Sequence, residues 1–172
     1  MTDVVGTINV IAPELLIDSL ETNYGVIQRQ LKGLTHEDSL LQLPFRGNCL
    51  NWVLGHIAWS RERMLKALNE SLVWDAEQKA RYQRDSQPVT GGEDALRLEV
   101  ILDVLNIQQE RILAALKSKT AEDLKPMSVE IIPGAPPQSI GDWMHFLVWH
   151  EAYHVGQTEL LRQLTGVNDK VI

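Results

Sequence analysis

The sequence predicts an all-α fold, in particular a four-helix bundle. Four long segments repeat apolar residues at intervals of three and four, which is the spacing of one face of an α-helix. Long connections separate these segments and carry most of the prolines, and no segment shows the apolar-polar alternation of a half-buried strand. At 172 residues, 44% hydrophobic and 23% charged, the chain is expected to form a single domain over 1–172.

The first two helices are bounded by turn and capping residues. Residues 12–33 carry Pro13 in the first turn and close at Gly33. After a connector with one proline and one glycine, Asn48 is expected to cap a second helix that runs to about Asn69.

The other two helices follow long connections. Residues 70–92 are long for a structureless loop, so we expect them to be functional or to contain a short helix. A third helix is predicted over 93–118, and the "SVEII" segment of the next connection is expected to be extended. Ser139, with an acidic residue three positions later, is expected to cap a fourth helix that ends at Leu164.

Composition excludes several classes of protein. No apolar run approaches the roughly 20 residues of a spanning helix, so a membrane is not an expected partner. The N-terminus lacks the basic start and cleavage site of a secretory signal, which favours a cytoplasmic location. The net charge of −7, without Lys/Arg clusters, argues against nucleic acid. The single cysteine, Cys49, rules out an internal disulfide and is expected to be a buried thiol.

Three histidines form a candidate metal site. His150 and His154 lie one turn apart on an inward stripe of the fourth helix, close enough for both rings to reach one ion at about 2.0 Å. His56 lies on an apolar stripe of the second helix and is the expected third ligand, although such a histidine alone is more often a core residue. His145 lies off the metal stripe, and His36 lies in a polar loop.

The letters "HEAYH" also match the H-E-x-x-H pattern of zinc proteases. A metzincin would need Gly at position 157 and His at position 160, where this chain has Gln157 and Leu160. The acidic residues after His154 are Glu159 and Asp169, and no strand is predicted that could align a peptide. We therefore do not expect a peptidase.

The segments "NWVLGHIAWSRERML" and "GDWMHFLVWHEAYHVGQTELLRQLTG" resemble the DinB-like superfamily of four-helix bundles. The resemblance implies an up-down-down-up bundle, frequent homodimers and a divalent ion such as zinc or nickel. Its histidine triad maps onto His56, His150 and His154. Several relatives use a low-molecular-weight thiol in transfer or isomerisation reactions, and many have no known reaction.

Residues around the triad suggest how a substrate is handled. Three neutral imidazoles leave a coordination position open, as in catalytic metal sites. Glu151 and Tyr153 are the expected proton-transfer groups, although Glu151 fits a salt bridge between helices equally well and a tyrosine such as Tyr153 is more commonly a core or interface residue. Gln157 fits two roles equally well, a hydrogen bond to the ligand and a buried amide that satisfies a helix end. An arginine at the mouth is expected to pair a carboxylate of the thiol, and the candidates are Arg46, Arg61 and Arg162.

Three functions stay open at this point. Metal-dependent transfer of a low-molecular-weight thiol to a small electrophile ranks first, ahead of small-molecule hydrolysis and of metal binding without catalysis. Trp59 and Trp149 fall off the apolar stripes, so we expect them at the pocket mouth or at a dimer face. With the resemblance, they predict a homodimer.

Overall fold

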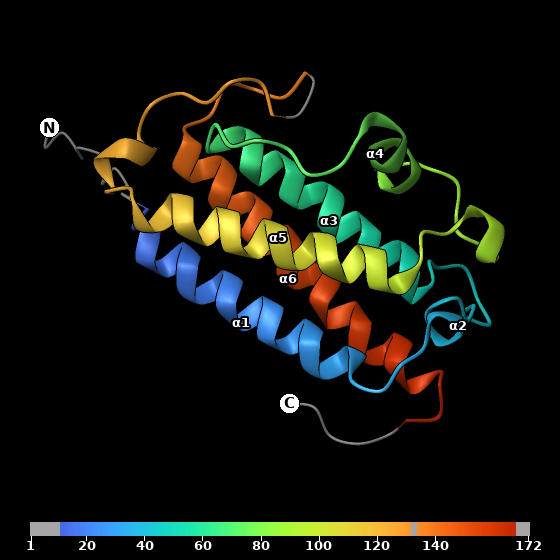
Figure 1. Ribbon diagram of the computed structural model, residues 1–172. Helices are drawn as coiled ribbons and strands as arrows, with labels where there is room; N and C mark the ends of the chain where they lie inside the picture. Colours follow the sequence, from blue (N-terminus) through green and yellow to red (C-terminus); the bar gives the residue numbers. More distant parts are fainter. Residues whose placement is uncertain (1–10, 132–133, 168–172) are drawn as a thin grey trace, which may run out of the picture.

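Four long helices pack side by side in the computed structural model, which describes residues 11–131 and 134–167 (Figure 1). The N-terminal segment, which lacks the sequence features of a secretory signal, lies largely outside this range. The described residues form six α-helices, two 3-10 helices and no β-strand, as the all-α prediction requires. The elements are α1 Pro13–Leu31, α2 His36–Ser39, α3 Leu50–Ala67, α4 Ala76–Tyr82, η1 Gly92–Asp94, α5 Leu98–Lys117, η2 Glu122–Leu124 and α6 Ile140–Gln163.

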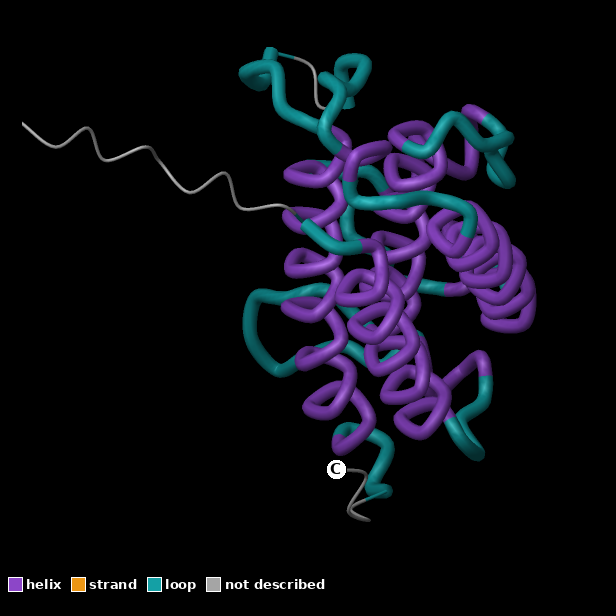
Figure 2. The backbone as a smooth tube through the Cα atoms, turned by 90° about the vertical axis from the view of Figure 1, so that its left-hand side faces the viewer, coloured by secondary structure: helices purple, strands orange, loops and turns teal. Residues whose placement is uncertain are grey.

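The four long helices form a closed ring of neighbours. Both α5 and α6 pack against α1 and against α3, so the apolar stripes of all four helices meet in the middle. Figure 2 shows these helices side by side in a second view. The up-down-down-up order of helix directions stays a prediction.

Local signals at the helix starts explain where one predicted boundary holds and two fail. The Ser139 hydroxyl accepts a hydrogen bond from the Asp142 amide at 3.0 Å, as expected for the α6 cap. Asn48 does not cap α3, because Cys49 occupies the N-cap position without a side-chain hydrogen bond. The helix α5 begins at Leu98 rather than near residue 93, because the Leu96 amide donates to the Tyr82 hydroxyl instead of entering a helix.

Two of the connections contain short helices. A capping box between Asp75 and Gln78 starts α4, which confirms that the connection over 70–92 contains a helix. The loop assignment of His36 was wrong, because this residue is buried in α2 and its Nδ1 accepts the Leu98 amide at 3.2 Å. Residues 128–130 of the "SVEII" segment have no regular secondary structure, the preceding Met127 forms an isolated antiparallel bridge with Ser139, and Ile132 lies outside the described residues.

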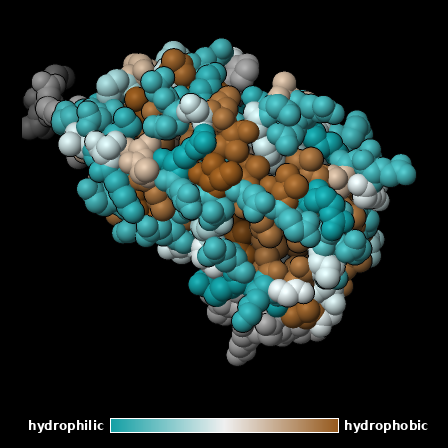
Figure 3. All heavy atoms as spheres, viewed as in Figure 1, coloured by the Kyte–Doolittle hydropathy of each residue, from teal (hydrophilic) through white to brown (hydrophobic). Residues whose placement is uncertain are grey.

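The exterior is mixed in character. Hydrophilic side chains cover much of the face seen in Figure 3, and hydrophobic atoms are visible between them. Within the described part of the chain, no helix has both the length and the apolarity to cross a membrane.

A fully buried ion pair connects α3 to α6. The Arg61 side chain donates from Nε to Glu151 Oε2 at 2.8 Å and from Nη2 to Oε1 at 2.9 Å, and both side chains are 0% exposed. Its Nη1 donates to the Leu105 carbonyl of α5 at 3.0 Å, and its guanidinium lies 5.2 Å from the ring centre of Tyr24 on α1. One side chain therefore contacts all four long helices.

We predict that Glu151→Gln lowers the free energy of unfolding by about 3–5 kcal/mol, because it leaves the buried Arg61 charge unpaired. The double variant Arg61→Met/Glu151→Leu removes both charges and should recover most of that loss. Urea denaturation monitored by circular dichroism measures the free energy of unfolding of both variants. A loss below about 1 kcal/mol in Glu151→Gln would contradict the assigned role of the pair.

Candidate metal centre

The structure brings the three predicted histidines together. His56 projects from α3, and His150 and His154 project from α6. One ring nitrogen of each lies within 4.8 Å of the others. The Nε2 atoms of His150 and His154 are 3.2 Å apart. Two nitrogens bound to one tetrahedral ion at about 2.0–2.1 Å lie about 3.3 Å apart, so this spacing fits a shared ion.

The orientation of His56 is fixed by a backbone carbonyl. Its Nδ1 lies 2.8 Å from the carbonyl oxygen of Tyr82. A carbonyl only accepts, so Nδ1 carries the proton and the Nε2 lone pair is left for a metal. The imidazole also stacks on Trp52 and Trp59, with ring centres 4.7 and 4.9 Å away.

The other two histidines have side-chain partners at Nδ1. His154 Nδ1 lies 2.7 Å from the amide oxygen of Gln157, and His150 Nδ1 lies 3.3 Å from the Ser60 hydroxyl. When both Nδ1 atoms donate to these oxygens, all three histidines present Nε2 to the same point. Such partners set the tautomer and the ring orientation in metal sites.

Burial keeps the site neutral at pH 7. It lowers the pKa of His56 to about 4 and that of His150 to about 3, and His154 adds to both shifts. Burial also lowers the pKa of His154, against the opposing effect of its hydrogen bond to Gln157. Neutral imidazoles have the free lone pair that metal binding requires.

The triad lies on the wall of a cavity of about 1280 Å³, which leaves room for a ligand beside a bound ion. The wall combines aromatic and aliphatic side chains with a few polar groups, as ligand sites usually do. Tyr153 lines it with 60% of its surface exposed, and its ring lies edge-on to His154 at 5.2 Å. The cavity is also lined by Arg46, Trp52, Trp59, Arg63, Arg84, Asp85, Ser86 and Gln157.

Several of the predicted roles need revision. Glu151 and Arg61 do not line the cavity, because each is fully buried in their mutual ion pair. Neither is therefore placed to exchange protons with a ligand or to bind its carboxylate. Arg162 is also buried and donates to the carbonyls of Gln30 and Lys32, so of the three candidate arginines only Arg46 lines the cavity.

Sequence reasoning missed four residues of the site. Ser60 and Tyr82 hold histidine rings, and Arg63 and Arg84 line the cavity. The signal for Arg63 was its seven-residue spacing from His56, which is two turns on the same helix face. No comparable signal was present for the Tyr82 carbonyl, because any residue type supplies one.

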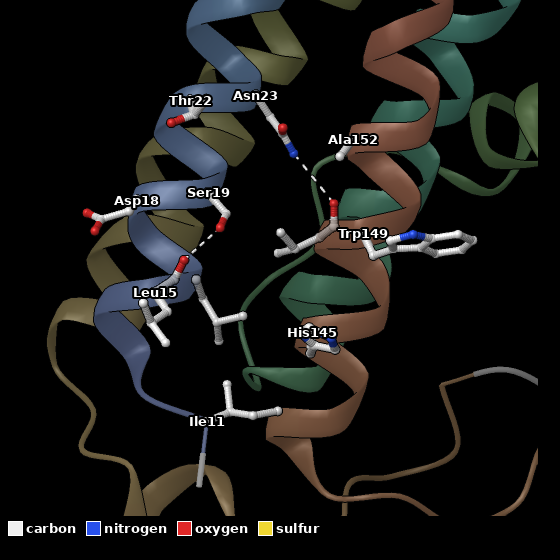
Figure 4. Close-up of a pocket in the computed structure, with 11 residues that line it drawn as sticks. Ile11, Leu15, Asp18, Ser19, Thr22, Asn23, His145, Trp149 and Ala152 are labelled. Atoms are coloured by element: carbon white, nitrogen blue, oxygen red, sulfur yellow. Dashed lines mark hydrogen bonds between the residues drawn. The ribbon is translucent and has the colours of Figure 1, made fainter. Parts of the chain in front are cut away.

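A second cavity, of about 670 Å³, lies between α1 and α6. Figure 4 shows Asn23 of α1 reaching toward α6, with the Trp149 indole extending away from α1. The cavity contains no group of metal ligands among the described residues. Of the two tryptophans that fall off the apolar stripes, Trp59 lines the cavity of the histidine triad, which we call the metal cavity, and Trp149 lines the second cavity. The homodimer stays a prediction.

Cys49 is a buried thiol, as predicted. It is fully covered and its sulfur lies 3.5 Å from the Val89 carbonyl. Burial raises the pKa of the thiol, which keeps it protonated and unreactive.

A close approach at Gly55 holds Tyr82 against α3. A Cβ atom at this position would lie 2.2 Å from the Tyr82 ring, so only glycine permits the contact. The Tyr82 hydroxyl also donates to Asn51 Oδ1 at 2.8 Å. Both contacts fix the carbonyl that orients His56.

We predict that Gly55→Ala costs about 1–3 kcal/mol of stability, because it overpacks the Tyr82 contact. It should also weaken metal binding about 10- to 100-fold, because the His56 partner is displaced. Thermal unfolding and metal titration measure the two effects. The control is Gly25→Ala on α1, where the new methyl meets Arg29 at an ordinary 3.6 Å and stability should not fall. Equal stability and equal metal affinity of the two variants would contradict the role of Gly55 in holding Tyr82.

Comparison with known proteins agrees with this architecture. The model of the DinB superfamily matches residues 19–158. A conserved protein from Enterococcus faecalis has a similar structure, with a TM-score of 0.66, 16% identity, and coverage of 88% of this chain and 95% of the other. A DinB-like protein from Bacillus cereus gives a TM-score of 0.61 and 18% identity over 91% of this chain and 94% of its own. No curated protein matches. The chain belongs to the DinB superfamily.

Proposed function

We propose that the three histidines bind one divalent metal ion per chain and that the protein transfers a low-molecular-weight thiol to a small electrophile. The observation that carries this proposal is the convergence of three neutral imidazoles on the wall of a large, open cavity. A divalent ion in this site would lower the pKa of a coordinated thiol. Nitrogen ligands suit several metals, and the resemblance to the family favours zinc or nickel.

The position of Glu151 favours thiol transfer over hydrolysis. In zinc proteases the glutamate of H-E-x-x-H activates a water molecule. Here that glutamate is 0% exposed and paired with Arg61, so it does not serve as a base in the cavity. A thiol loses its proton more easily than water does, so thiol chemistry depends less on such a base.

Two cavity residues are placed to act on the reactants. In the proposed reaction the thiol sulfur forms a bond to the electrophilic carbon, and the leaving group departs with the electron pair of the broken bond. Tyr153 passes the thiol proton to that leaving group or to solvent. Gln157 holds His154 through its amide oxygen, and its amide nitrogen donates to the bound ligand.

We predict one metal ion per chain in the purified protein, and less than half that amount in His56→Ala and in His150→Ala, because each removes one of three ligands. Elemental analysis measures the stoichiometry. His145→Ala is the matched control, because His145 lines the other cavity, and it should keep the full amount. Unchanged stoichiometry in the triad variants would mean that these histidines are only core residues.

We predict that turnover of a chromogenic electrophile requires both the metal and an added low-molecular-weight thiol. Tyr153→Phe should lower kcat at least tenfold with an unchanged metal content, because it removes a proton-transfer group but no ligand. The assay compares a panel of thiols with ester and amide substrates, before and after chelation. Metal-dependent turnover that ignores added thiol would replace this proposal with a hydrolase. Metal binding without turnover on any substrate would support a non-catalytic role.

A further inference from the structure

The wall of the metal cavity is positively charged although the chain is acidic. Three arginines line it, namely Arg46, Arg63 and Arg84, against a single acidic residue, Asp85. The Asp85 side chain is 88% exposed and lies 3.6 Å from Arg84. In a chain with a net charge of −7, this local excess of positive charge attracts anions to the cavity.

The surroundings of Arg63 favour the binding of an anion. Its guanidinium lies 3.5 Å from the ring centre of Trp59, and the residue is only partly exposed. It forms no ion pair with any carboxylate among the described residues. Burial and the nearby charge of Arg84 lower the pKa of Arg63 to about 10, so it stays charged at neutral pH. An anion bound between the two arginines would relieve their repulsion.

The arginines and the histidines belong to one continuous surface. Trp52, His56, Trp59 and Arg63 follow one another at intervals of four, three and four along one face of α3. The Trp52 indole donates to the Ser86 hydroxyl at 3.0 Å, which ties the loop that carries Arg84 to this face. His56 and Arg63 are about 10 Å apart along the helix axis, since each residue rises about 1.5 Å.

We propose that Arg63 and Arg84 form an oxyanion subsite that binds a carboxylate or phosphate of the substrate, while the other end of the same molecule reaches the three histidines. A guanidinium binds two oxygens of such a group side by side. An extended chain spans about 3.3–3.6 Å per residue, so a molecule of about tripeptide size bridges about 10 Å. The contact of the ligand with a metal at the histidines and its identity as a thiol rest on the proposed function; the oxyanion subsite depends on the arginines alone.

The first arm of the test needs no thiol. Glutarate and inorganic phosphate are titrated separately into the zinc-loaded protein, with tryptophan fluorescence as the readout because Trp59 touches Arg63. Arg63→Gln should weaken binding about tenfold or more, the size expected for a lost charge-assisted hydrogen bond. Arg63→Lys keeps the charge but lacks the planar guanidinium group, so its anion affinity should lie between those of the unaltered protein and Arg63→Gln. The charge-matched control is Arg29→Gln on α1, away from the cavity, which should bind like the unaltered protein. Stronger binding of one anion identifies the group that the subsite takes.

The second arm uses calorimetry with glutathione and its diethyl ester, which keeps the thiol and blocks both carboxylates. The acid should bind at least about tenfold more tightly than the ester, and Arg63→Gln should abolish that preference. Anion binding that depends on Arg63 without thiol binding would support the subsite and overturn the thiol proposal. Thiol binding that is indifferent to esterification and to Arg63→Gln would overturn the subsite alone. Circular dichroism of each variant confirms that it folds.

Discussion

The buried ion pair between Arg61 and Glu151 is the constraint on which the metal centre depends. Ser60 precedes Arg61 and His150 precedes Glu151, so the pair that joins α3 to α6 also sets the histidines against each other. A shift of one residue along either helix turns a side chain by about 100° and moves it by about 1.5 Å. Such a shift would leave two buried charges unpaired, which is far more costly than a poor apolar contact. The pair therefore selects one register of the two helices.

The orientation of the His56 imidazole depends on a different part of the chain. His56 takes its tautomer from the carbonyl of Tyr82, which lies 26 positions later at the end of α4. That carbonyl is held because Tyr82 packs directly on Gly55 and bonds Asn51 through its hydroxyl. The long connection between α3 and α5 is thus part of the site, since it supplies the partner that points Nε2 at the cavity.

The use of Glu151 in the core explains why a zinc-protease pattern occurs here without the arrangement of a protease. On a helix the pattern H-E-x-x-H fixes the direction of the glutamate relative to the two histidines, but it does not determine which group the glutamate contacts. In this chain the glutamate faces Arg61 in the core, and the groups that remain beside the histidines are arginines, aromatic rings and a tyrosine. The chemistry of the cavity is consequently that of a cationic pocket without a carboxylate base among its buried residues.

The sequence by itself determined the four long helices, the Ser139 cap and the grouping of His56, His150 and His154. The helices and the pairing of His150 with His154 follow from the apolar periodicity and from spacings of three and four residues within one helix, and the Ser139 cap follows from its local sequence. His56 joins the pair through its place on an apolar stripe of another helix and through the family resemblance. Only the tertiary structure decided that Arg61 is buried and Arg63 lines the cavity, that Glu151 is a core residue, and that Tyr82 holds His56. The side chains of residues two positions apart on a helix, such as Arg61 and Arg63, point about 200° away from each other. The role of each arginine therefore depends on which neighbouring helix covers it. A backbone carbonyl leaves no mark in the sequence, because every residue carries one.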